Sequence, residues 1–445
     1  MVASLAPSYS PPPYQLYPPY PPPPYGPPPP YEGDSIEVGY FRDGANNLDG
    51  PDSILDGQVQ EASQRDPRIR INAEVLTGVY GHGGLRTYFW KVDHGVVSQV
   101  RMEDFHDMAG RSELANFIAA TEEDAYLHHR KHVYLFLVDH GAGDAGCNFT
   151  QEPDGSIQHT SLDTLRGAIN DGNALEKKRE PGDINAHIEL VEYHECFMAT
   201  IRDAETLSAA GVRYVLATSE SSMAPGVSGY TLLDLAAHAN DPQAQGRALV
   251  DRVMNTIYEV NEHGHLILYH PVANFMMLDL DPKKIGPLKM EERKLNHELM
   301  YYLSISPLFR KDLLEDINSV QGMDRDQSQG AFLAGSQGRS PWRSDRPSVA
   351  VYMTIADDPR LPPVVQHDAA LLAFLIMSIV IYHAESKNYL DAGSPTIHFP
   401  TSIPDIDPCA PAIEETDNAE SYLNGQNALI SALNATVYPP QVMVA

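Results

Sequence analysis

The feature that most constrains the fold is an alternation of short apolar runs with amphipathic stretches between residues 36 and 219. The apolar runs are IEVGYF, IRINAEVLTG, HVYLFLVDH, HIELVEYHE and VRYVLATS. HVYLFLVDH is apolar nearly throughout, as expected of a central strand covered on both faces. SELANFIAATEEDAYLHH and FMATIRDAETLSAAG, which lie between the runs, have a helical pattern. This order predicts an α/β fold with a mostly parallel central sheet and helices on both sides.

The rest of the pattern predicts a hairpin within this sheet and a second region of mixed structure after it. RTYFWKVDHGVVSQVRM, with Asp-His-Gly at its centre, is typical of a β-hairpin inserted into the sheet. DPQAQGRALVDRVMNTIYEVNEH predicts one long helix, whereas HLILYH and SVAVYMTI predict two further strands. The apolar stretch from Ala369 to Tyr382 is too short to cross a bilayer and predicts a buried core helix.

Residues 1–33 form an arm dominated by proline and tyrosine. Because proline lacks a backbone N–H and fixes φ, we expect this arm to be extended or disordered rather than packed. Its Pro-Pro-x-Tyr stretches, such as Pro11 to Tyr14, resemble ligands of aromatic-lined proline-binding grooves. A solvated spacer is the simpler interpretation, and the sequence leaves both open.

Charge and cysteine content exclude several classes of partner. The chain has 60 acidic and 31 basic residues, a formal net charge of −29. Such a surface repels nucleic acid and anionic membranes, so neither is an expected partner.

Three cysteines cannot form a disulfide framework and fit a reducing compartment, and the N-terminus lacks the pattern of a secretory signal. We therefore expect a soluble, cytoplasmic protein.

Two apolar runs end in residues that carry nucleophilic chemistry. HVYLFLVDH places His140 at a strand end, followed by Gly141, which permits a close backbone approach. HIELVEYHE leads into Cys196 and then, as the pattern suggests, directly into a helix whose N-terminus would favour the thiolate. Functional groups of parallel sheets collect beyond the carboxyl ends of strands. A histidine and a cysteine on neighbouring strand ends suffice for nucleophilic peptide cleavage.

Other residues compete for these roles. His94 repeats the Val-Asp-His-Gly motif of His140, but it follows an alternating hairpin strand. Cys147 lies in a GDAGCNFT loop without a buried strand before it and a helix after it, and Cys409 lies in a polar stretch. We therefore prefer His140 and Cys196 as the catalytic pair.

A zinc site is the alternative use of the histidines. The candidate ligands are His128, His129 and His132, together with His187, His194 and Cys196. We expect His187 and His194 on one strand, with their side chains on opposite faces of the sheet. HHRKH lies at a helix end, where histidines are commonly solvated. No metal site is predicted from the sequence, and no EF-hand spacing is present.

Four segments in order resemble the clostripain family of the caspase-like cysteine peptidases, a group that includes caspases, legumains and gingipains. YFRDGANNLD is similar to the first strand and following turn of that family, and YGHGGLRTYFW to its early hairpin. VYLFLVDHGAG resembles its His-Gly strand, and YVLATSESSMAPGVSGY its Ala-Ser-Glu segment followed by Pro-Gly and an aromatic residue. The resemblance covers much of residues 36–290.

The resemblance implies a caspase-like α/β/α sandwich and a role for each residue of the pair. Cys196 would attack the scissile carbonyl, His140 would protonate the leaving amine, and the N–H groups of Gly141 and Cys196 would form the oxyanion hole. The expected organisation is the arm 1–33, a peptidase domain 34–290, and a C-terminal extension 291–445 packed on it, with a flexible loop 321–347. No cofactor is required, although the family resemblance leaves calcium open as a ligand.

One position departs from the clostripain pattern. That family has an aspartate two residues before the nucleophile, linked to a basic P1 side chain, whereas this chain has His194 there. Glu195 or Glu220 could supply the negative charge instead, so cleavage after arginine or lysine is a hypothesis with His194, Glu195 and Glu220 as S1 candidates.

The resemblance also implies maturation by cleavage between the histidine and cysteine strands. NALEKKREPGD, residues 173–183, contains Lys177, Lys178 and Arg179 and is the expected activation loop. The alternative is a basic helix C-terminus that complements the helix dipole. The peptidase interpretation implies peptide and protein substrates and an upstream activating protease. By analogy, it also suggests a place in a bacterial defence or cell-death cascade. A catalytically inactive scaffold, or a binding protein that uses its arm, is the alternative function.

Overall fold

The computed structural model describes residues 35–46, 48–78, 85–151, 157–179, 187–220, 227–256, 258–262, 265–269, 274–320, 345–385 and 394–398. They belong to one compact unit that begins at Asp34. The arm 1–33, most of the expected loop (321–344) and Cys409 lie outside the described residues. Among the helices described, none has the length and apolar character needed to cross a membrane.

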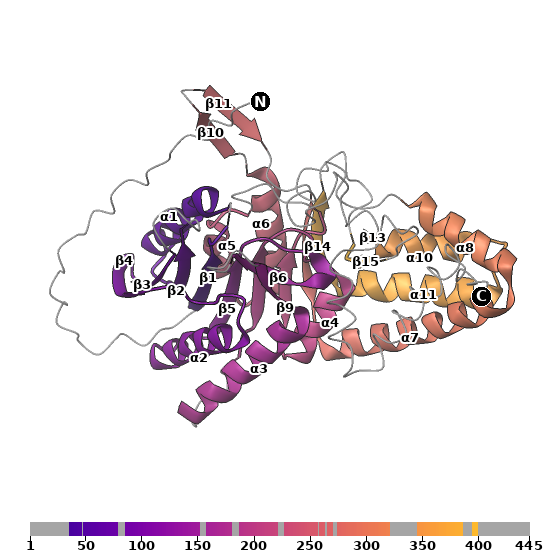
Figure 1. Ribbon diagram of the computed structural model, residues 1–445, viewed down its shortest axis with the longest axis horizontal. Coiled ribbons are helices and arrows are strands. Elements are labelled where there is room, and N and C mark those ends of the chain that lie inside the picture. The colour runs from indigo at the N-terminus through magenta and orange to yellow at the C-terminus, as the bar shows by residue number, and fades with distance from the viewer. Residues whose placement is uncertain are drawn as a thin grey trace, which may run out of the picture. The chain divides into compact units, whose positions relative to one another are not determined.

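A nine-stranded sheet forms the centre of this unit (Figure 1). Its strands lie in the order β14 (Val380–Glu385), β12 (Asn274–Asp279), β9 (Tyr214–Ala217), β8 (Leu190–His194), β5 (His132–Val138), β1 (Ile36–Asp43), β2 (Ile69–Thr77), β3 (Arg86–Asp93) and β4 (Val96–Glu103). The central strands β9, β8, β5, β1 and β2 are parallel, whereas the strands at both edges are antiparallel. The predicted mostly parallel sheet is confirmed, and the predicted hairpin belongs to it as its β3–β4 edge.

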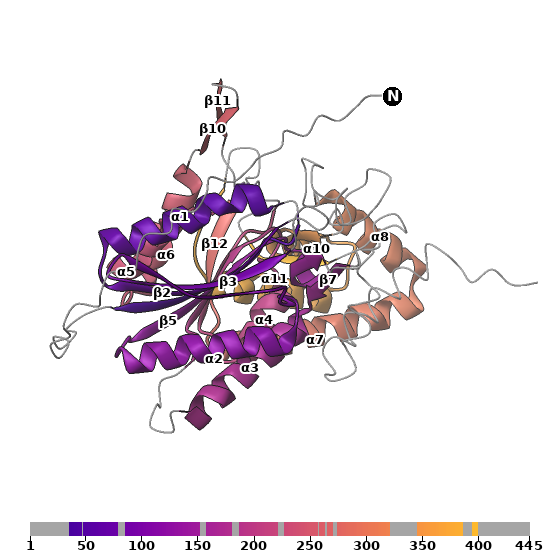
Figure 2. The same cartoon turned by 60° about the vertical axis from the view of Figure 1, so that its left-hand side comes forward.

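Helices cover both faces of the sheet (Figure 2). One face carries α1 (Asp49–Arg65), α5 (Thr231–Ala237) and α6 (Pro242–Asn255), and the other carries α2 (Arg111–Leu127), α3 (Leu162–Arg179), α4 (Ile201–Ala209) and α7 (Pro282–Ile305). Neighbouring residues of β1 show why both faces are needed. Tyr40 donates a 3.0 Å hydrogen bond to Asp56 of α1, whereas the ring of Phe41 lies 5.1 Å from that of Phe117 on α2. Because successive side chains of a strand alternate, an apolar run must be covered twice.

The C-terminal region packs α8 (Pro307–Ser319), α10 (Ser348–Asp357) and α11 (Pro363–Ile379) around α7. The expected domain boundary at residue 290 falls inside α7, and β14, which follows α11, extends the main sheet beside β12. The two expected parts therefore share one sheet.

Smaller elements surround the main sheet. They are the pairs β6 (Cys147–Gln151) with β7 (Ile157–Thr160), β10 (Tyr258–Glu262) with β11 (His265–Tyr269), and β13 (Asp345–Pro347) with β15 (Thr396–His398), and the short 3₁₀ helix η1 (Gly143–Ala145).

Three local predictions were wrong in type or extent. SVAVYMTI forms helix α10 instead of a strand, because its buried residues Ser348, Val351, Tyr352 and Ile355 recur at helical spacing. The long helix predicted over residues 241–263 ends at Asn255 and gives way to strand β10. The predicted core helix over Ala369–Tyr382 likewise changes to strand β14 at Val380, where β-branched residues favour extended backbone.

Candidate active site

His140 and Cys196 occupy equivalent positions beyond two neighbouring parallel strands. Val138, the last residue of β5, pairs with His194, the last residue of β8. Each candidate lies two residues further along its strand, and hydrogen-bonded strands run about 4.8 Å apart. Both side chains are buried, since His140 is 4% and Cys196 5% exposed. The sheet therefore brings the two predicted residues to one place at its carboxyl edge.

Gly141 brings the two strand ends into direct contact. A Cβ atom at this position would lie 2.2 Å from the carbonyl oxygen of Cys196 and 3.0 Å from Cβ of Glu195. Real Cβ atoms do not approach other atoms so closely, so only glycine fits here. The backbone of Gly141 consequently packs on the carbonyl group of Cys196.

The Cys196 segment is a turn held by the neighbouring strand. Phe197 adopts a left-handed φ of 61°, and its N–H donates a 3.2 Å hydrogen bond to the carbonyl oxygen of Glu220. The Ala199 N–H donates to the Thr218 carbonyl at 2.9 Å. Because these bonds hold the chain against the end of β9, α4 begins only at Ile201, capped by Thr200. The prediction that a helix follows Cys196 directly was wrong.

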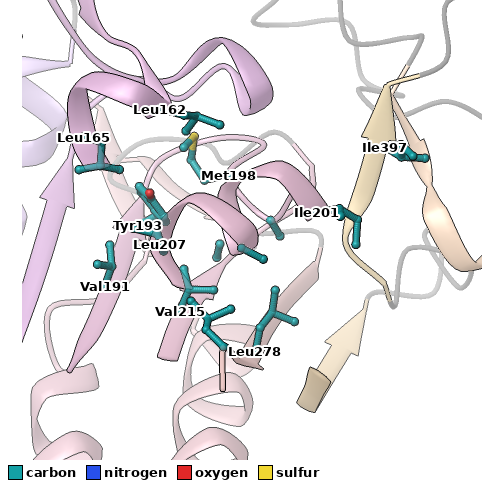
Figure 3. Close-up of a cluster of buried hydrophobic side chains, with 14 of the residues drawn as sticks. Leu162, Leu165, Val191, Tyr193, Met198, Ile201, Leu207, Val215, Leu278 and Ile397 are labelled. Atoms are coloured by element: carbon teal, nitrogen blue, oxygen red, sulfur yellow. The ribbon is translucent and has the colours of Figure 1, made fainter. Parts of the chain in front are cut away.

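Apolar packing fixes the strand that carries Cys196. Figure 3 shows Tyr193, just before the site, and Met198, just after it, in one buried cluster with Leu162 and Leu207. The Tyr193 hydroxyl also donates a 2.9 Å hydrogen bond to Asp203 of α4. A cluster of this kind limits the movement of the Cys196 turn, because any displacement would expose apolar surface.

Burial controls the protonation of His140. Removal from water lowers the pKa of the His140 imidazole to about 4, because the charged form loses its hydration. The ring is therefore neutral at neutral pH and acts first as a proton acceptor. Its predicted role as the acid that protonates the leaving amine requires that it first take a proton from the thiol.

A buried carboxylate precedes His140 and was missed by the sequence analysis. Asp139 accepts a 2.6 Å hydrogen bond from Asn46 Nδ2 and a second one from the Phe149 N–H. Asn46 also donates to the Phe149 carbonyl at 3.2 Å. Burial, and then the nearby carboxylates of Asp43 and Glu195, raise the pKa of Asp139 well above its usual value. Asp139 and Asn46 both follow parallel strands, and that position is the signal that could have identified them.

The rival residues lie in less suitable places. His94 forms the β3–β4 turn, and Val92 pairs with Ile71 near the start of β2, so His94 is at the opposite edge of the sheet from His140. Its side chain is 51% exposed and lies 2.7 Å from Asp93. Cys147 is fully buried and paired with Gly141, and burial followed by the charge of Glu195 raises its thiol pKa well above the usual value. A thiol so strongly protonated is a poor nucleophile.

The three S1 candidates lie around the Cys196 turn. His194 faces the α5 side, where Nδ1 lies 3.0 Å from the Val227 carbonyl and Nε2 3.2 Å from Glu192. Glu195 and Glu220 are each 1% exposed, and Glu220 contacts the turn through its backbone. The predicted residues are thus neighbours, and their contribution to specificity remains a prediction.

The proposed activation residues do not lie in the loop that was expected. Lys177, Lys178 and Arg179 form the last turn of α3, and the first two are exposed. Residues 180–186 lie outside the described residues. A basic last turn is stabilised by the helix dipole, which was the alternative interpretation.

The zinc alternative receives no support from the positions of its histidines. His128 Nδ1 bonds to the backbone carbonyl of Asp124, and His132 pairs with Glu189. Within the described ranges, the donors that lie close enough to share a metal ion belong to a different set, Glu74, His106 and Glu113.

Comparison with known proteins identifies the fold through structure rather than sequence. No protein-family model and no curated protein sequence matches the chain. A secreted C11 cysteine protease from Bacteroides thetaiotaomicron, "iotapain", is 11% identical, with 88% of this chain and 99% of that chain covered and a TM-score of 0.53. A structure of a secreted C11 cysteine protease from the same organism, with an irreversible peptide inhibitor, is 12% identical over 82% of this chain and 89% of that one, with a TM-score of 0.52.

A third similar structure is that of an inactive zymogen C11 protease from Parabacteroides distasonis. It is 13% identical, covers 88% of this chain and 98% of its own, and has a TM-score of 0.53. The sheet and its two helical layers are therefore those of the caspase-like α/β/α class. Within that class the chain has the fold of the clostripain-like C11 proteases, which confirms the structural expectation drawn from the four segments.

Proposed function

We propose that the chain is a cysteine endopeptidase with Cys196 as nucleophile and His140 as its proton-transfer partner. The observation that carries this proposal is the in-register pairing of β5 and β8, which places both residues two positions beyond paired strand ends. The contact between Gly141 and the carbonyl group of Cys196 supports the proposal that the backbone N–H groups of these two residues serve as the oxyanion hole. A nucleophile and a base at neighbouring strand ends, with backbone N–H groups as the proposed oxyanion donors, suit acyl transfer.

The reaction follows from the neutral state of His140. The imidazole accepts the Cys196 thiol proton, and the thiolate forms a C–S bond to the scissile carbonyl carbon. The N–H groups of Gly141 and Cys196 bind the oxyanion of the tetrahedral intermediate. As the C–N bond breaks, the His140 imidazolium protonates the leaving amine. Water, deprotonated by His140, then hydrolyses the thioester and regenerates the thiol.

The proposed substrates are peptides with arginine or lysine at P1. The support is the acidity of the site, where the buried carboxylates of Glu195 and Glu220 lie beside the Cys196 turn. A formal net charge of −29 would also attract basic peptides. We also propose a cytoplasmic location and no required cofactor. Calcium is a ligand that the family resemblance leaves open, and both points need direct tests.

We further propose that the chain is made as a zymogen. Both catalytic side chains are almost completely buried, which leaves little access for a substrate before the site opens. Cleavage near Lys177, Lys178 and Arg179, by the chain itself or by an upstream protease, would release the connection between β5 and β8. A place in a defence or cell-death cascade is the extension of this idea.

The test compares the wild type with Cys196→Ala and with Cys147→Ala as a matched thiol control. Each is followed on gels and with fluorogenic peptides that carry Arg, Lys or Asp at P1, with and without calcium. We expect turnover and labelling by a thiol-reactive peptide inhibitor in the wild type and in Cys147→Ala, and neither in Cys196→Ala. Activity that survives in Cys196→Ala would contradict the proposal.

If the wild type shows no activity, it is treated with trypsin, which cuts after basic residues such as Lys177 and Lys178. Activity or inhibitor labelling that then appears supports the zymogen. Continued silence after cleavage contradicts the peptidase and favours an inactive scaffold of the same fold, or a binding protein that uses its Pro/Tyr-rich arm. A pull-down with the arm alone tests the last function.

A further inference from the structure

A second group of chemically active side chains lies between β2, α2 and the segment that joins β4 to α2. It consists of Glu74 on β2, His106 in the connecting segment and Glu113 in the first turn of α2, here called the Glu74–His106–Glu113 cluster. One ligand atom from each residue lies within 4.8 Å of the other two. His106 Nδ1 lies 2.9 Å from Glu113 Oε1 and 3.4 Å from Glu74 Oε1. Three separate elements thus direct their donors to one point.

The burial of Glu74 distinguishes this cluster from ordinary surface charges. Its side chain is 2% exposed, compared with 18% for His106 and 26% for Glu113. Glu74 Oε1 is completely buried and accepts no hydrogen bond from the residues that the structure describes, although it points toward the His106 ring. A buried carboxylate oxygen whose nearest donor, His106 Nδ1, lies 3.4 Å away is costly, and a bound cation would remove that cost.

A fourth residue gives His106 the environment of a metal ligand. Glu103 Oε2 lies 2.7 Å from Nε2, on the side of the ring opposite the cluster. Metal-bound histidines commonly donate the N–H of the second nitrogen to a carboxylate, which fixes the tautomer and orients the ring. With Nε2–H donated to Glu103, an ion that displaces the proton on Nδ1 meets a lone pair on the atom that faces Glu74 and Glu113.

The donor set indicates the kind of ion. One imidazole nitrogen and two carboxylate oxygens suit zinc and related divalent transition metals, whereas calcium prefers six to eight oxygen ligands. We propose that Glu74, His106 and Glu113 bind a divalent transition-metal ion of the zinc class, with Glu103 as the residue that positions His106.

A cavity beside the cluster provides room for the remaining ligands. It has a volume of about 190 Å³, and both Glu74 and Glu113 line it together with Phe89, Lys91 and Arg101. Water molecules in this space can complete the coordination of an ion held by three protein ligands. The cluster is separate from the candidate active site, whose residues follow β5 and β8.

The ion would have a structural effect. Its ligands come from β2, from the segment after the β3–β4 hairpin and from α2, so binding would tie the edge hairpin to the central sheet. Because a ligand that binds only the folded state raises stability by mass action, zinc should raise the unfolding temperature.

The test uses Cys196→Ala as the parent, since the Cys196 thiol and His140 could themselves bind zinc. Zinc binding is measured by titration calorimetry and by metal analysis after dialysis, and thermal unfolding is followed with zinc and with calcium. His106→Gln removes the nitrogen ligand. Glu113→Gln removes an oxygen ligand that is more exposed, so the proposal can still be tested if the His106→Gln variant fails to fold. His94→Gln is the matched control, because His94 lies in the β3–β4 turn beside Asp93 outside the cluster.

We expect one zinc ion per chain in the parent and in His94→Gln, with a rise in unfolding temperature that calcium does not reproduce. Loss of an outer partner of a metal site weakens binding about 10- to 100-fold, so His106→Gln and Glu113→Gln should weaken it at least as much. Equal zinc affinity in the parent and in a folded His106→Gln or Glu113→Gln variant would overturn the proposal. So would an equal loss of affinity in His94→Gln, or a stronger response to calcium.

Discussion

Gly141 and the carbonyl oxygen of Cys196 are in such close contact that a Cβ atom on residue 141 would lie 2.2 Å from that oxygen. The contact joins the ends of two neighbouring parallel strands, each of which supplies one residue of the candidate pair. The spacing of the pair therefore depends on the absence of a side chain at residue 141. That dependence can be tested without changing either reactive group.

Gly141→Ala should lower both stability and activity. Overpacking of a tight contact costs about 1–3 kcal/mol, and a shift of about 1 Å at a reacting centre lowers the rate about 100-fold. Urea unfolding and kcat/KM measure the two effects. Gly57→Ala in α1 is the control, since a Cβ there meets nothing within 4 Å and should be neutral or stabilising by up to about 1 kcal/mol. A Gly141→Ala enzyme with unchanged stability would contradict the close contact.

The low pKa of His140 predicts an acid-dependent loss of stability. Burial lowers this pKa from 6.5 to about 4, so between these values the unfolded chain binds a proton that the folded chain does not. The free energy of unfolding is therefore unaffected by this group above pH 6.5 and falls as the pH drops from 6.5 toward 4. The full loss is roughly 3 kcal/mol at about 1.4 kcal/mol per pKa unit.

Replacement of the titrating ring isolates this effect. Urea unfolding of the wild type and of His140→Gln at pH 7.5 and pH 4.5 should show a loss in the wild type that exceeds the loss in the variant by up to about 3 kcal/mol. Equal losses in the two proteins would show that His140 titrates normally and is accessible to water.

The apolar runs made the sheet and the proximity of His140 and Cys196 predictable, because one local pattern determined both. A fully buried strand such as β5 needs a continuous apolar run, and the residue that follows such a run reaches the carboxyl edge. Asn46 and Asp139 were missed because their relationship is a hydrogen bond between the ends of two different strands. The Glu74–His106–Glu113 cluster was missed for the same reason, since no local spacing links residues on β2, a connecting segment and α2.

Asn46→Ala should disturb the support of His140. It removes the donor to Asp139 Oδ1 and to the Phe149 carbonyl, both buried, and loss of a partner of a buried polar group costs about 1–3 kcal/mol. We expect lower stability and a fall in kcat with little change in KM, because Asn46 acts through Asp139. Asn255→Ala, at the exposed end of α6, should change stability by less than about 0.5 kcal/mol. A fall in stability with unchanged kcat would assign Asn46 a purely structural role.

Replacement of Lys177, Lys178 and Arg179 together by alanine should block maturation if cleavage occurs beside them. Their position in the last turn of α3 also predicts a small loss of helix stability from the dipole, about 0.3–1 kcal/mol. Gel analysis during expression and after trypsin treatment distinguishes the two effects. Lys311→Ala, an exposed lysine on α8, is the control and should leave processing unchanged. Normal processing in the triple variant would exclude cleavage beside these three residues and leave them only a role in the stability of α3.

Glu195 and Glu220 can be separated as sources of P1 specificity by matched glutamine variants. Both carboxylates are buried, but only Glu195 adjoins Cys196 in sequence and lies beside the Gly141 contact, with its Cβ 3.0 Å from a Cβ built on Gly141. A hydrogen bond to a charged group contributes about 1.5–3 kcal/mol, so Glu195→Gln should lower kcat/KM for an Arg-P1 peptide about 10- to 100-fold. A peptide with a neutral P1 residue should be cleaved as before, and Glu220→Gln should change both substrates little. An equal loss of kcat/KM for both peptides would make Glu195 a structural residue. Cleavage only after neutral or acidic residues would contradict a pocket that recognises a basic P1 side chain.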